Sequence, residues 1–528
     1  MMKKNVFLIT SLLVALVDFA NAQNAVIRIN IHDTIGHINK NIYGNFAEHL
    51  GRCIYGGIYE EGSPLSDKDG FRKDVKQAVK DLHVPLLRYP GGNFVSNYHW
   101  EDGIGPKEER PTRLNLAWGN IDNNHVGTDE FMKYCKEIGA EPYLAVNMGT
   151  GSMREAQAWV EYCNVKSGPY YAKLRKKNGH AEPYNVKYWS LGNEVDGPWQ
   201  IGHMNAEDYC KKAKEFGKIM KLTDPDIKLI GVGAANFNPG AHPYDWDRTI
   251  LENLKNTIDY ISMHMYVGNV SDNYYDFVAS PLVMGKRTKI IKQMINEVML
   301  NANRGNRDPI YIAWDEYNVW YRARSGGKMV GNHALEERYN LEDALVIAGF
   351  LNGFIRNADV VKMANMAQLV NVIAPIFTNE KGLFLQTIYY PLQLFTKHMR
   401  GISLNTFVHC DTYDTNNFFL GLSERKAQLN NVPYLDVSAS YKDNGEVTIC
   451  VVNRNKDKSI TTDLISEVGD FSGDFKVWEI NGPDVKSTND FDQTSVKTKT
   501  LPEVKADGQK LTYSFPPHSI TMLQGDIQ

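Results

Sequence analysis

Two glutamates in this 528-residue chain each follow a short apolar run, a position from which a carboxylate can do chemistry. Glu194 closes the run Tyr188–Asn193, and Glu316 closes the run Tyr311–Asp315. Two carboxylates that face one cavity suit glycoside hydrolysis, one as acid/base and the other as nucleophile. Either glutamate alone could instead cap a loop or pair with an arginine, so the hypothesis requires a fold that brings the two together.

Other apolar runs in the same part of the chain also end in polar side chains. Glu48 and His49 follow one run, and Arg88 precedes Pro90–Asn93 in another. Further residues of this kind are His264, Tyr266, Gln368 and Asn371. A ring of such hydrogen-bond donors and acceptors suits a neutral substrate rich in hydroxyl groups.

The elements that must position these side chains alternate between two patterns. Short apolar runs predict strands at Ile42–Phe46, Pro85–Tyr89, Pro142–Asn147, Val186–Leu191, Lys228–Val232, Tyr260–His264, Pro309–Trp314 and Val360–Met366. Amphipathic segments predict helices at Phe71–Leu82, Asp129–Ile138, Met153–Cys163, Ala206–Leu222, Trp246–Leu254, Lys286–Ala302, Leu341–Asn357 and Thr387–His398. This alternation predicts an α/β fold, a parallel sheet covered by helices, and its count matches a (β/α)₈ barrel.

A (β/α)₈ barrel carries its active site at the C-terminal ends of the strands. Glu194 and Glu316 would then end the fourth and seventh strands and face each other across the mouth of the barrel. A doubly wound open sheet is the competing fold. Its nucleotide-binding fingerprint is incomplete here, because Gly231-Val232-Gly233 is followed by Asn236 where a third glycine would stand.

The pattern changes after about residue 400. Alternating apolar residues at 435–441 and 447–451 flank Asn444-Gly445, which is a strong hairpin signal. Further strand patterns at Phe475–Ile480, Leu511–Phe515 and Ile520–Leu523 predict a C-terminal antiparallel β-sandwich over residues 401–528. Val26–Ile31 also alternates, so we expect residues 23–40 to add a strand to that sandwich and residues 41–400 to form the barrel.

The first 22 residues have the pattern of a secretory signal peptide. Lys3 and Lys4 precede the apolar run Val6–Val17, and Ala20-Asn21-Ala22 fits a cleavage site. The run is too short to span a membrane, and no cysteine stands at the cleavage point to carry a lipid anchor. We therefore expect an exported protein without a membrane anchor, in the periplasm or in the medium.

Composition and missing motifs argue against several partners. Lys and Arg number 58 against 62 Asp and Glu, so the chain lacks the basic excess typical of nucleic-acid binding. The sequence has no Walker pattern and no H-E-x-x-H pattern, and its six cysteines form no CxxC pair. Asp67-Lys68-Asp69-Gly70 begins like a calcium loop but lacks the rest of one. We predict no cofactor and no catalytic metal.

Five ordered motifs together resemble the family 51 glycoside hydrolases, the α-L-arabinofuranosidases. They are Tyr43–Gly57, Leu87–Phe94, Leu191–Gly197, Asp315–Tyr321 and Ala367–Pro375. The resemblance runs from about residue 26 to the C-terminus and so covers nearly the whole chain after the signal peptide.

The sequence departs from the family pattern at two aromatic positions. Tyr317 stands where many relatives carry Trp, and Tyr89 stands where the motif R-W-P-G-G is common. Both remain aromatic, so the departures affect the fine shape of the pocket and leave the chemistry unchanged.

The resemblance implies a retaining mechanism in which Glu194 is the general acid/base and Glu316 the nucleophile. It implies that Asn193 holds the sugar 2-hydroxyl, that Tyr266 hydrogen-bonds Glu316, and that His264 lies beside the acid/base. Carboxyl groups of a retaining pair lie about 5–5.5 Å apart. A general acid must be protonated near neutral pH, so we expect Glu194 to lie in a weakly compensated pocket.

The resemblance also implies the remaining substrate contacts and the assembly. Glu48, Arg88, Asn93 and Gln368 are expected to bind arabinofuranose or to position the nucleophile, and Trp118 and Trp320 are expected to line the aglycone side. The fold implied is a (β/α)₈ barrel with a C-terminal β-sandwich, assembled as a homo-oligomer, a hexamer in many relatives.

Two other functions remain open at this point. One is an endo-acting glycanase of a related barrel family. The other is a sugar-binding protein built on a barrel that has lost catalysis, and such a loss would show first at a carboxylate. Both Glu194 and Glu316 are present, which favours an enzyme. The leading hypothesis is an exported, exo-acting α-L-arabinofuranosidase for arabinan, arabinoxylan or oligosaccharides derived from them.

Overall fold

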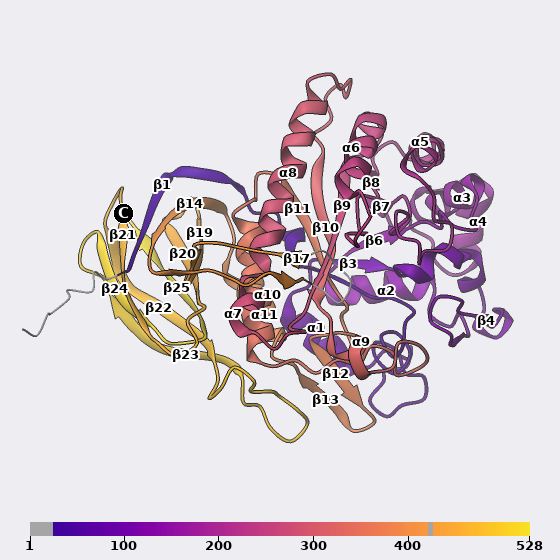
Figure 1. Ribbon diagram of the computed structural model, residues 1–528. Coiled ribbons are helices and arrows are strands. Elements are labelled where there is room, and N and C mark those ends of the chain that lie inside the picture. Colours follow the sequence, from indigo (N-terminus) through magenta and orange to yellow (C-terminus); the bar gives the residue numbers. More distant parts are fainter. Residues whose placement is uncertain (1–24, 421–425) are drawn as a thin grey trace, which may run out of the picture.

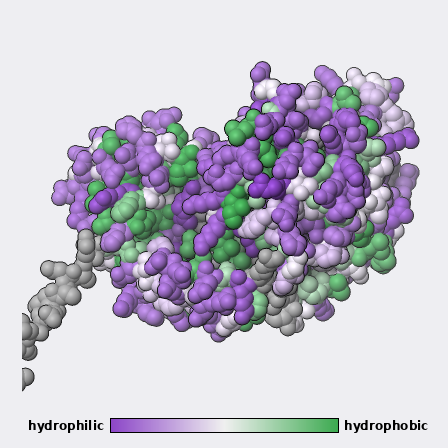
Figure 2. All heavy atoms as spheres, turned by 45° about the horizontal axis from the view of Figure 1, so that its top comes forward, coloured by the Kyte–Doolittle hydropathy of each residue, from purple (hydrophilic) through white to green (hydrophobic). Residues whose placement is uncertain are grey.

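The computed structural model describes residues 25–420 and 426–528. Residues 1–22, the predicted signal peptide, lie outside the described residues. The chain forms a strand barrel wrapped by helices, with a second domain of strands packed beside it (Figure 1). Hydrophilic residues dominate the face drawn in Figure 2, and apolar side chains are scattered among them.

Eight parallel strands close into a barrel in the order β10-β11-β2-β3-β6-β7-β8-β9. Their bounds are β2 (Gly44–Phe46), β3 (Leu86–Tyr89), β6 (Glu141–Ala145), β7 (Tyr188–Ser190), β8 (Lys228–Gly231), β9 (Tyr260–Val267), β10 (Tyr311–Val319) and β11 (Val361–Ala367). Each strand overlaps one of the predicted apolar runs, so the (β/α)₈ barrel is confirmed and the doubly wound sheet is wrong.

Helices surround the barrel, and the predicted ones are all present. They are α1 (Lys73–Leu82), α2 (Thr128–Ile138), α3 (Met153–Asn164), α5 (Ala206–Thr223), α6 (Pro243–Leu254), α8 (Pro281–Met299), α10 (Leu341–Ile355) and α11 (Tyr389–His398). The side chains of Ser152 and Asn205 cap α3 and α5, and left-handed Gly139 ends α2. Three short helices were not predicted, α4 (Tyr170–Lys177), α7 (Tyr274–Ala279) and α9 (Arg322–Gly326).

Short elements fill the loops around the barrel. Turns of 3₁₀-helix cover Lys40–Tyr43, Asn93–Asn97, Trp100–Gly103 and Lys107–Glu109. Paired short strands are β4 (Arg113–Leu114) with β5 (Ile121–Asp122), β12 (Ile376–Asn379) with β13 (Gly382–Leu385), β15 (Thr412–Tyr413) with β18 (Val432–Pro433), and β16 (Phe418–Phe419) with β17 (Lys426–Ala427). The loop between the strands of the β4–β5 hairpin carries Trp118, one of the predicted site residues.

The second domain is one continuous sheet in the order β23-β22-β25-β20-β19-β14-β1-β21-β24. Its strands are β1 (Ala25–His37), β14 (Ile402–His409), β19 (Leu435–Tyr441), β20 (Glu446–Asn453), β21 (Ile460–Ser466), β22 (Phe471–Asn481), β23 (Lys497–Lys505), β24 (Lys510–Phe515) and β25 (Ser519–Ile527). Leu464 and Phe515 from one end of the sheet share a core with Phe475 and Leu523 from the other end. The sheet therefore curls around its own core.

The N-terminal strand β1 lies inside this sheet, between β14 and β21. It runs antiparallel to β14 but parallel to β21, so the predicted antiparallel domain contains one parallel pair. No hairpin sets the direction of β1, because this strand comes from the N-terminus whereas the other strands of the sheet lie after residue 400.

Many apolar side chains of the barrel belong to one large core that extends to the second domain. All six cysteines are free thiols, and five of them are buried. Across the described part of the chain, no helix is both long enough and apolar enough to cross a membrane.

Candidate active site

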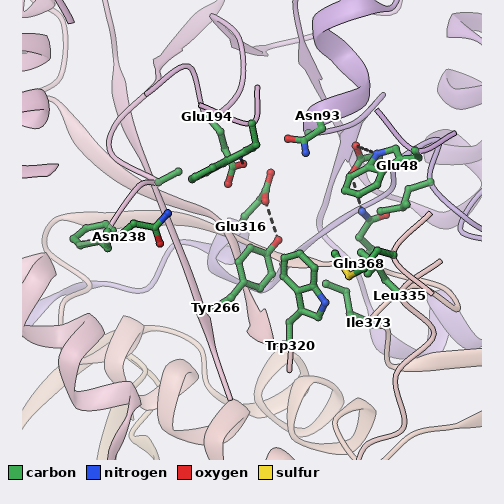
Figure 3. Close-up of a pocket in the computed structure, with 17 residues that line it drawn as sticks. Glu48, Asn93, Glu194, Asn238, Tyr266, Glu316, Trp320, Leu335, Gln368 and Ile373 are labelled. Atoms are coloured by element: carbon green, nitrogen blue, oxygen red, sulfur yellow. Dashed lines mark hydrogen bonds between the residues drawn. The ribbon is translucent and has the colours of Figure 1, made fainter. Parts of the chain in front are cut away.

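A pocket of about 300 Å³ opens where the barrel strands end. Eight of the eleven predicted site residues line it: Glu48, Asn93, Trp118, Glu194, Tyr266, Glu316, Trp320 and Gln368 (Figure 3). The other three, Arg88, Asn193 and His264, are buried and hydrogen-bond to one another or to the pocket glutamates. The fold thus brings all eleven predicted residues to one place.

Glu316 is the sixth residue of β10, and the strand continues past it to Val319. Arg88 on β3 donates from Nη1 to Glu316 Oε1 at 2.7 Å, and the Tyr266 hydroxyl on β9 donates to Oε2 at 2.8 Å. The second guanidinium nitrogen of Arg88 donates to Asn193 Oδ1 at 2.7 Å. Arg88 therefore fixes the nucleophile candidate and the asparagine next to Glu194 in one arrangement.

Glu194 lies four residues beyond the end of β7, in a turn that aims its carboxylate into the pocket. Its backbone is left-handed, with φ 41°, which is uncommon for a residue with a side chain and costs about 1–3 kcal/mol. Each of its two carboxylate oxygens has one nitrogen atom within hydrogen-bonding distance. His264 Nδ1 lies 2.8 Å from Oε1, and the indole nitrogen of Trp199 donates to Oε2 at 2.6 Å.

Burial alone would raise the pKa of the Glu194 carboxyl, but the hydrogen bond and charge of His264, with the Trp199 bond, outweigh it and hold this pKa below its ordinary value. The pKa of His264 is raised well above 6.5, because the charges and hydrogen bonds of Glu316, Asp315 and Glu194 outweigh burial. The expectation of a weakly compensated Glu194 is therefore wrong, because His264 and Trp199 both contact its carboxyl oxygens and lower its pKa.

Asp315 contacts His264 on the side away from Glu194. It is fully buried, accepts a hydrogen bond of 2.7 Å from the Tyr143 hydroxyl, and lies 3.3 Å from His264 Nε2. Since the same imidazole faces Glu194 through Nδ1, Asp315 fixes the orientation of His264.

Glu48 occupies the other end of the pocket from Asn238, with Glu316 between them (Figure 3). Its Oε1 accepts hydrogen bonds from the Trp118 indole at 2.9 Å and the Phe94 amide at 3.1 Å, and its Oε2 accepts one from Gln368 at 2.8 Å. Burial, with the charge of Glu316, outweighs these bonds and raises the pKa of Glu48 to about 7.

Two glycines of the Leu87–Phe94 motif allow the glutamates to approach the backbone. A Cβ at Gly91 would lie 2.7 Å from Glu48 Cγ, and one at Gly92 would lie 3.0 Å from Glu316 Oε1. A side chain at either position would displace a carboxylate of the pocket, which explains why the motif carries glycine there.

One ligand-type atom from each of Glu194, His264 and Glu316 lies within 4.8 Å of the others, a spacing that could suit a cation. These groups already have partners, because His264 faces both carboxylates and Arg88, Tyr266 and Trp199 donate to the glutamates. Alternating charges and hydrogen bonds thus account for the cluster.

Two strand-end residues from the sequence lie outside the pocket lining. His49 packs behind it, with Nδ1 2.5 Å from Asp122 and Nε2 2.9 Å from the Tyr89 hydroxyl. Asn371 donates to the backbone of Arg52 at 2.9 Å. Both are structural, because their polar atoms are used within the protein.

Six further pocket residues are not among those predicted from the sequence. Trp199, Phe237, Asn238, Met329, Leu335 and Ile373 line the pocket but lie on loops rather than on strands. Trp199 follows the Leu191–Gly197 motif by two residues, and that proximity was the available signal. Asp315 and Tyr143 carried a weaker signal, a polar side chain inside an apolar run.

Two family models match the chain. One is the α-L-arabinofuranosidase 1 domain, over residues 78–279, and the other is the α-L-arabinofuranosidase C-terminal domain, over residues 315–519.

Curated relatives and solved structures match over most of the chain. α-L-Arabinofuranosidase C of Emericella nidulans is 42% identical over 514 residues, 94% of this chain and 97% of the relative. An intracellular exo-α-(1→5)-L-arabinofuranosidase of Halalkalibacterium halodurans is 42% identical over 433 residues, 81% of this chain and 84% of the relative. The α-L-arabinofuranosidase of Thermotoga maritima, solved as an arabinose complex, has a TM-score of 0.87 and 42% identity, covering 95% of this chain and all of that one.

Proposed function

The chain belongs to the family 51 glycoside hydrolases and is an α-L-arabinofuranosidase, and we propose that it is an exo-acting, retaining enzyme that releases terminal L-arabinofuranose from arabinan, arabinoxylan or derived oligosaccharides. The observation that carries the mechanism is the spacing of Glu194 and Glu316, which have carboxylate oxygens within 4.8 Å of each other. An inverting pair would need about 6.5–9.5 Å to admit a water molecule. The small pocket volume supports exo action, because it suits one terminal sugar better than an extended chain.

In the first step Glu316 attacks the anomeric carbon while the bond from that carbon to the leaving-group oxygen breaks. Arg88 and Tyr266 hold the attacking carboxylate in place. Glu194 gives its proton to the departing oxygen. The proton is shared between Glu194 and His264. A bound neutral sugar excludes water from the pocket, and this favours the form of the pair in which both side chains are uncharged and the proton is on Glu194.

In the second step a water molecule attacks the anomeric carbon and gives a proton to Glu194, and the bond to Glu316 breaks. Two inversions retain the anomeric configuration. Glu48, Asn93 and Gln368 bind the sugar hydroxyls at the end of the pocket away from Asn238. Asn193, held by Arg88, binds the 2-hydroxyl, and Trp118 and Trp320 line the aglycone side.

Two proposals concern the protein outside its pocket. Export through a signal peptide at residues 1–22 rests on the sequence, and the Halalkalibacterium relative is named as intracellular, so cell fractionation with N-terminal sequencing must decide it. Assembly as a homo-oligomer, a hexamer, rests on family analogy, and light scattering that gave the monomer mass near 60 kDa would overturn it.

The roles of the two glutamates can be separated with azide. Glu194→Ala should still form the glycosyl intermediate from a dinitrophenyl arabinofuranoside, because dinitrophenolate leaves without a proton. Its second step should be slow, giving a burst, and azide should raise the steady rate and yield an arabinofuranosyl azide of retained configuration.

Glu316→Ala provides the matched comparison, since it lacks the atom that bonds to the anomeric carbon. It should show no burst, and any azide product should have the inverted configuration because azide then makes the single displacement. If the two variants behave the other way round, the assigned roles are swapped.

A further inference from the structure

Apolar packing does little to hold the hairpin that carries Trp118. Its side chains Leu114, Leu116 and Ile121 are all more than half exposed, and the hairpin also lines a second cavity of about 380 Å³. Even so, the Trp118 indole lies close enough to donate to Glu48 Oε1 at 2.9 Å. The position of this loop therefore depends largely on directed polar contacts.

Two polar side chains, one on each side of Trp118 in the sequence, attach the loop to His49. Asn115 donates to the His49 carbonyl at 2.7 Å and accepts from the Trp118 amide at 3.1 Å. Asp122 lies 2.5 Å from His49 Nδ1, and Asn115 and Asp122 are both buried. The Gly331 amide adds a third contact, since it donates to the Trp118 carbonyl at 2.8 Å. His49 is thus the common partner of the two ends of the loop.

The imidazole of His49 is itself fixed by further contacts. Its Nε2 lies 2.9 Å from the Tyr89 hydroxyl, which donates to the Val126 carbonyl at 3.1 Å. The imidazole also stacks on the ring of Phe94, with 4.7 Å between the ring centroids and 19° between the planes. Tyr89 is one of the two departures from the family motifs, and its hydroxyl is the group that makes this contact.

The same imidazole supports the second donor of Glu48. The Phe94 amide donates to Glu48 Oε1 at 3.1 Å, and the ring of this phenylalanine is the one that stacks on His49. His49 also follows Glu48 directly in the chain. Both donors to Oε1, the Trp118 indole and the Phe94 amide, are therefore placed by contacts with one residue.

The contact between Asp122 and His49 carries charge. Burial alone would raise the pKa of the Asp122 carboxyl, but the charge and hydrogen bond of His49 outweigh it and hold this pKa below its ordinary value. Hydrogen bonds from the Asn124 amide at 2.8 Å and the Tyr55 hydroxyl at 2.9 Å act in the same direction. Asp122 is therefore ionised, and hydrogen bonds to a charged group are stronger than those between neutral groups.

We propose that His49 is a positioning residue for sugar recognition: it joins the Trp118 loop and the Phe94 amide to the carboxylate of Glu48 and is itself outside the pocket lining. The proposal rests on the role of Glu48 in the proposed function. With both donors held in this way, Glu48 meets the sugar hydroxyls without rearranging its own contacts when the sugar binds.

The test uses Asp122→Ala and Asn115→Ala, which each free one end of the loop and leave the pocket glutamates unchanged. An arabinofuranosyl disaccharide and a dinitrophenyl arabinofuranoside contain the same sugar, so both substrates should be affected alike. We expect kcat/KM to fall about tenfold on each, mostly through a higher KM, because a displaced Glu48 binds the sugar less well before and during the reaction. A variant that was only partly folded would lose kcat in proportion and keep its KM.

A double-mutant cycle tests whether the effect passes through the Trp118 indole. In a Trp118→Phe background, which lacks the N–H that reaches Glu48, Asp122→Ala should have a further effect of about twofold or less. Tyr89→Phe removes only the hydroxyl that contacts His49. It should raise KM by a smaller factor than Asp122→Ala, since Asp122 still holds Nδ1.

Asp129→Ala is the matched control for loss of a buried aspartate. Asp129 has the same kinds of partner, because it accepts a hydrogen bond of 2.6 Å from the Tyr184 hydroxyl and lies 3.6 Å from His180, but it does not line the pocket. This variant should have a lower melting temperature and an unchanged KM.

An unchanged KM in Asp122→Ala would overturn the proposal, as would an effect of Asp122→Ala that is equally large in the Trp118→Phe background. Glu48→Gln separates these failures from failure of the proposed function. If Glu48→Gln keeps its full kcat/KM, Glu48 does not bind the sugar as a carboxylate, and the role of His49 fails with it. If Glu48→Gln is impaired and Asp122→Ala is not, only the positioning role fails.

Discussion

At the scale of single residues, the pocket provides a donor for every carboxylate oxygen of its three glutamates. Arg88 and Tyr266 serve Glu316, His264 and Trp199 face Glu194, and Glu48 is bonded by Trp118, Phe94 and Gln368. Donors fixed in this way cost no reorganisation during reaction. A change at one glutamate therefore disturbs a defined set of contacts.

The charge of Glu48 can be removed while its shape is kept. In Glu48→Gln, the new side-chain oxygen can still accept hydrogen bonds from Trp118 and Phe94. The oxygen of Gln368 is buried without a hydrogen bond, so the Gln368 amide can turn and accept a hydrogen bond from the new NH₂ group. A hydrogen bond to a charged group exceeds a neutral one by about 1–1.5 kcal/mol, so we expect kcat/KM on a nitrophenyl arabinofuranoside to fall about tenfold.

The melting temperature of Glu48→Gln should stay close to that of the unmodified protein. Glu109→Gln, at an exposed glutamate, is the control and should change neither value. Unchanged kcat/KM in Glu48→Gln would mean that Glu48 does not bind the sugar as a carboxylate.

At the scale of elements, the start of α10 carries a buried group of charges. Asp343 and Glu342 are fully buried, and Glu337 accepts hydrogen bonds from the backbone at the start of α9. Arg322 donates to Asp343 at 2.9 Å and lies 3.8 Å from Glu337. Burial, with the charge of Glu342, raises the pKa of Asp343 to about 7 against the opposing effect of Arg322.

This raised pKa fixes the sign of a pH effect on stability. A carboxyl whose pKa is higher in the folded protein contributes stability below its unfolded pKa, and that contribution is lost as pH rises from about 4 through about 7. A tenfold change in an acid dissociation constant corresponds to about 1.4 kcal/mol of free energy. In Asp343→Asn this loss should be absent, so the variant should lose less stability than the unmodified protein between pH 4.5 and about 8.

Thermal unfolding measured across this pH range checks the expectation. Asn at 343 can still accept from the Asn340 amide, so α10 keeps its cap. Glu252→Gln, at an exposed position of α6, should follow the unmodified protein. A stability difference between Asp343→Asn and the unmodified protein that does not change with pH would contradict the assignment.

The elements also mark what a sequence can and cannot predict. Buried parallel strands are short apolar runs, so all eight barrel strands could be located, and polar residues after those runs, such as Glu48 and Gln368, could be assigned to the pocket. Trp199 and Asn238 could not, because loop residues reach the pocket through turns that leave no periodic pattern. The lowered pKa of Glu194 could not be predicted either, since it depends on contact with His264, which is 70 residues away in the chain.

At the scale of the whole molecule, the two domains are joined by a buried ionic contact. The Asp436 carboxylate on β19 accepts a hydrogen bond from Arg356 at the end of α10 and lies 2.7 Å from Arg454 Nη2. The backbone carbonyl of Asp436 accepts a hydrogen bond of 3.1 Å from Asn352. Arg454 in turn donates to the carbonyl of Val278 in α7 at 3.1 Å. One carboxylate thus connects the curled sheet to two helices of the barrel.

Replacing this carboxylate should weaken both the contact between the domains and the second domain itself, because Arg356 follows a barrel helix whereas Arg454 follows β20 of the sheet. Asp436→Asn leaves Arg454, which is 1% exposed, without a compensating charge, and breaking a buried pair in this way costs about 3–5 kcal/mol. We expect calorimetry to show a lower melting temperature, with the second domain unfolding before the barrel, whereas the unmodified protein should unfold in one transition. Asp443→Asn, at an exposed turn of the same sheet, should unfold like the unmodified protein. Because Asp436 lies outside the pocket lining, kcat/KM at 25 °C should be unchanged in Asp436→Asn. A variant that lost activity in proportion to its loss of stability would show instead that the barrel cannot keep its pocket intact without the sheet.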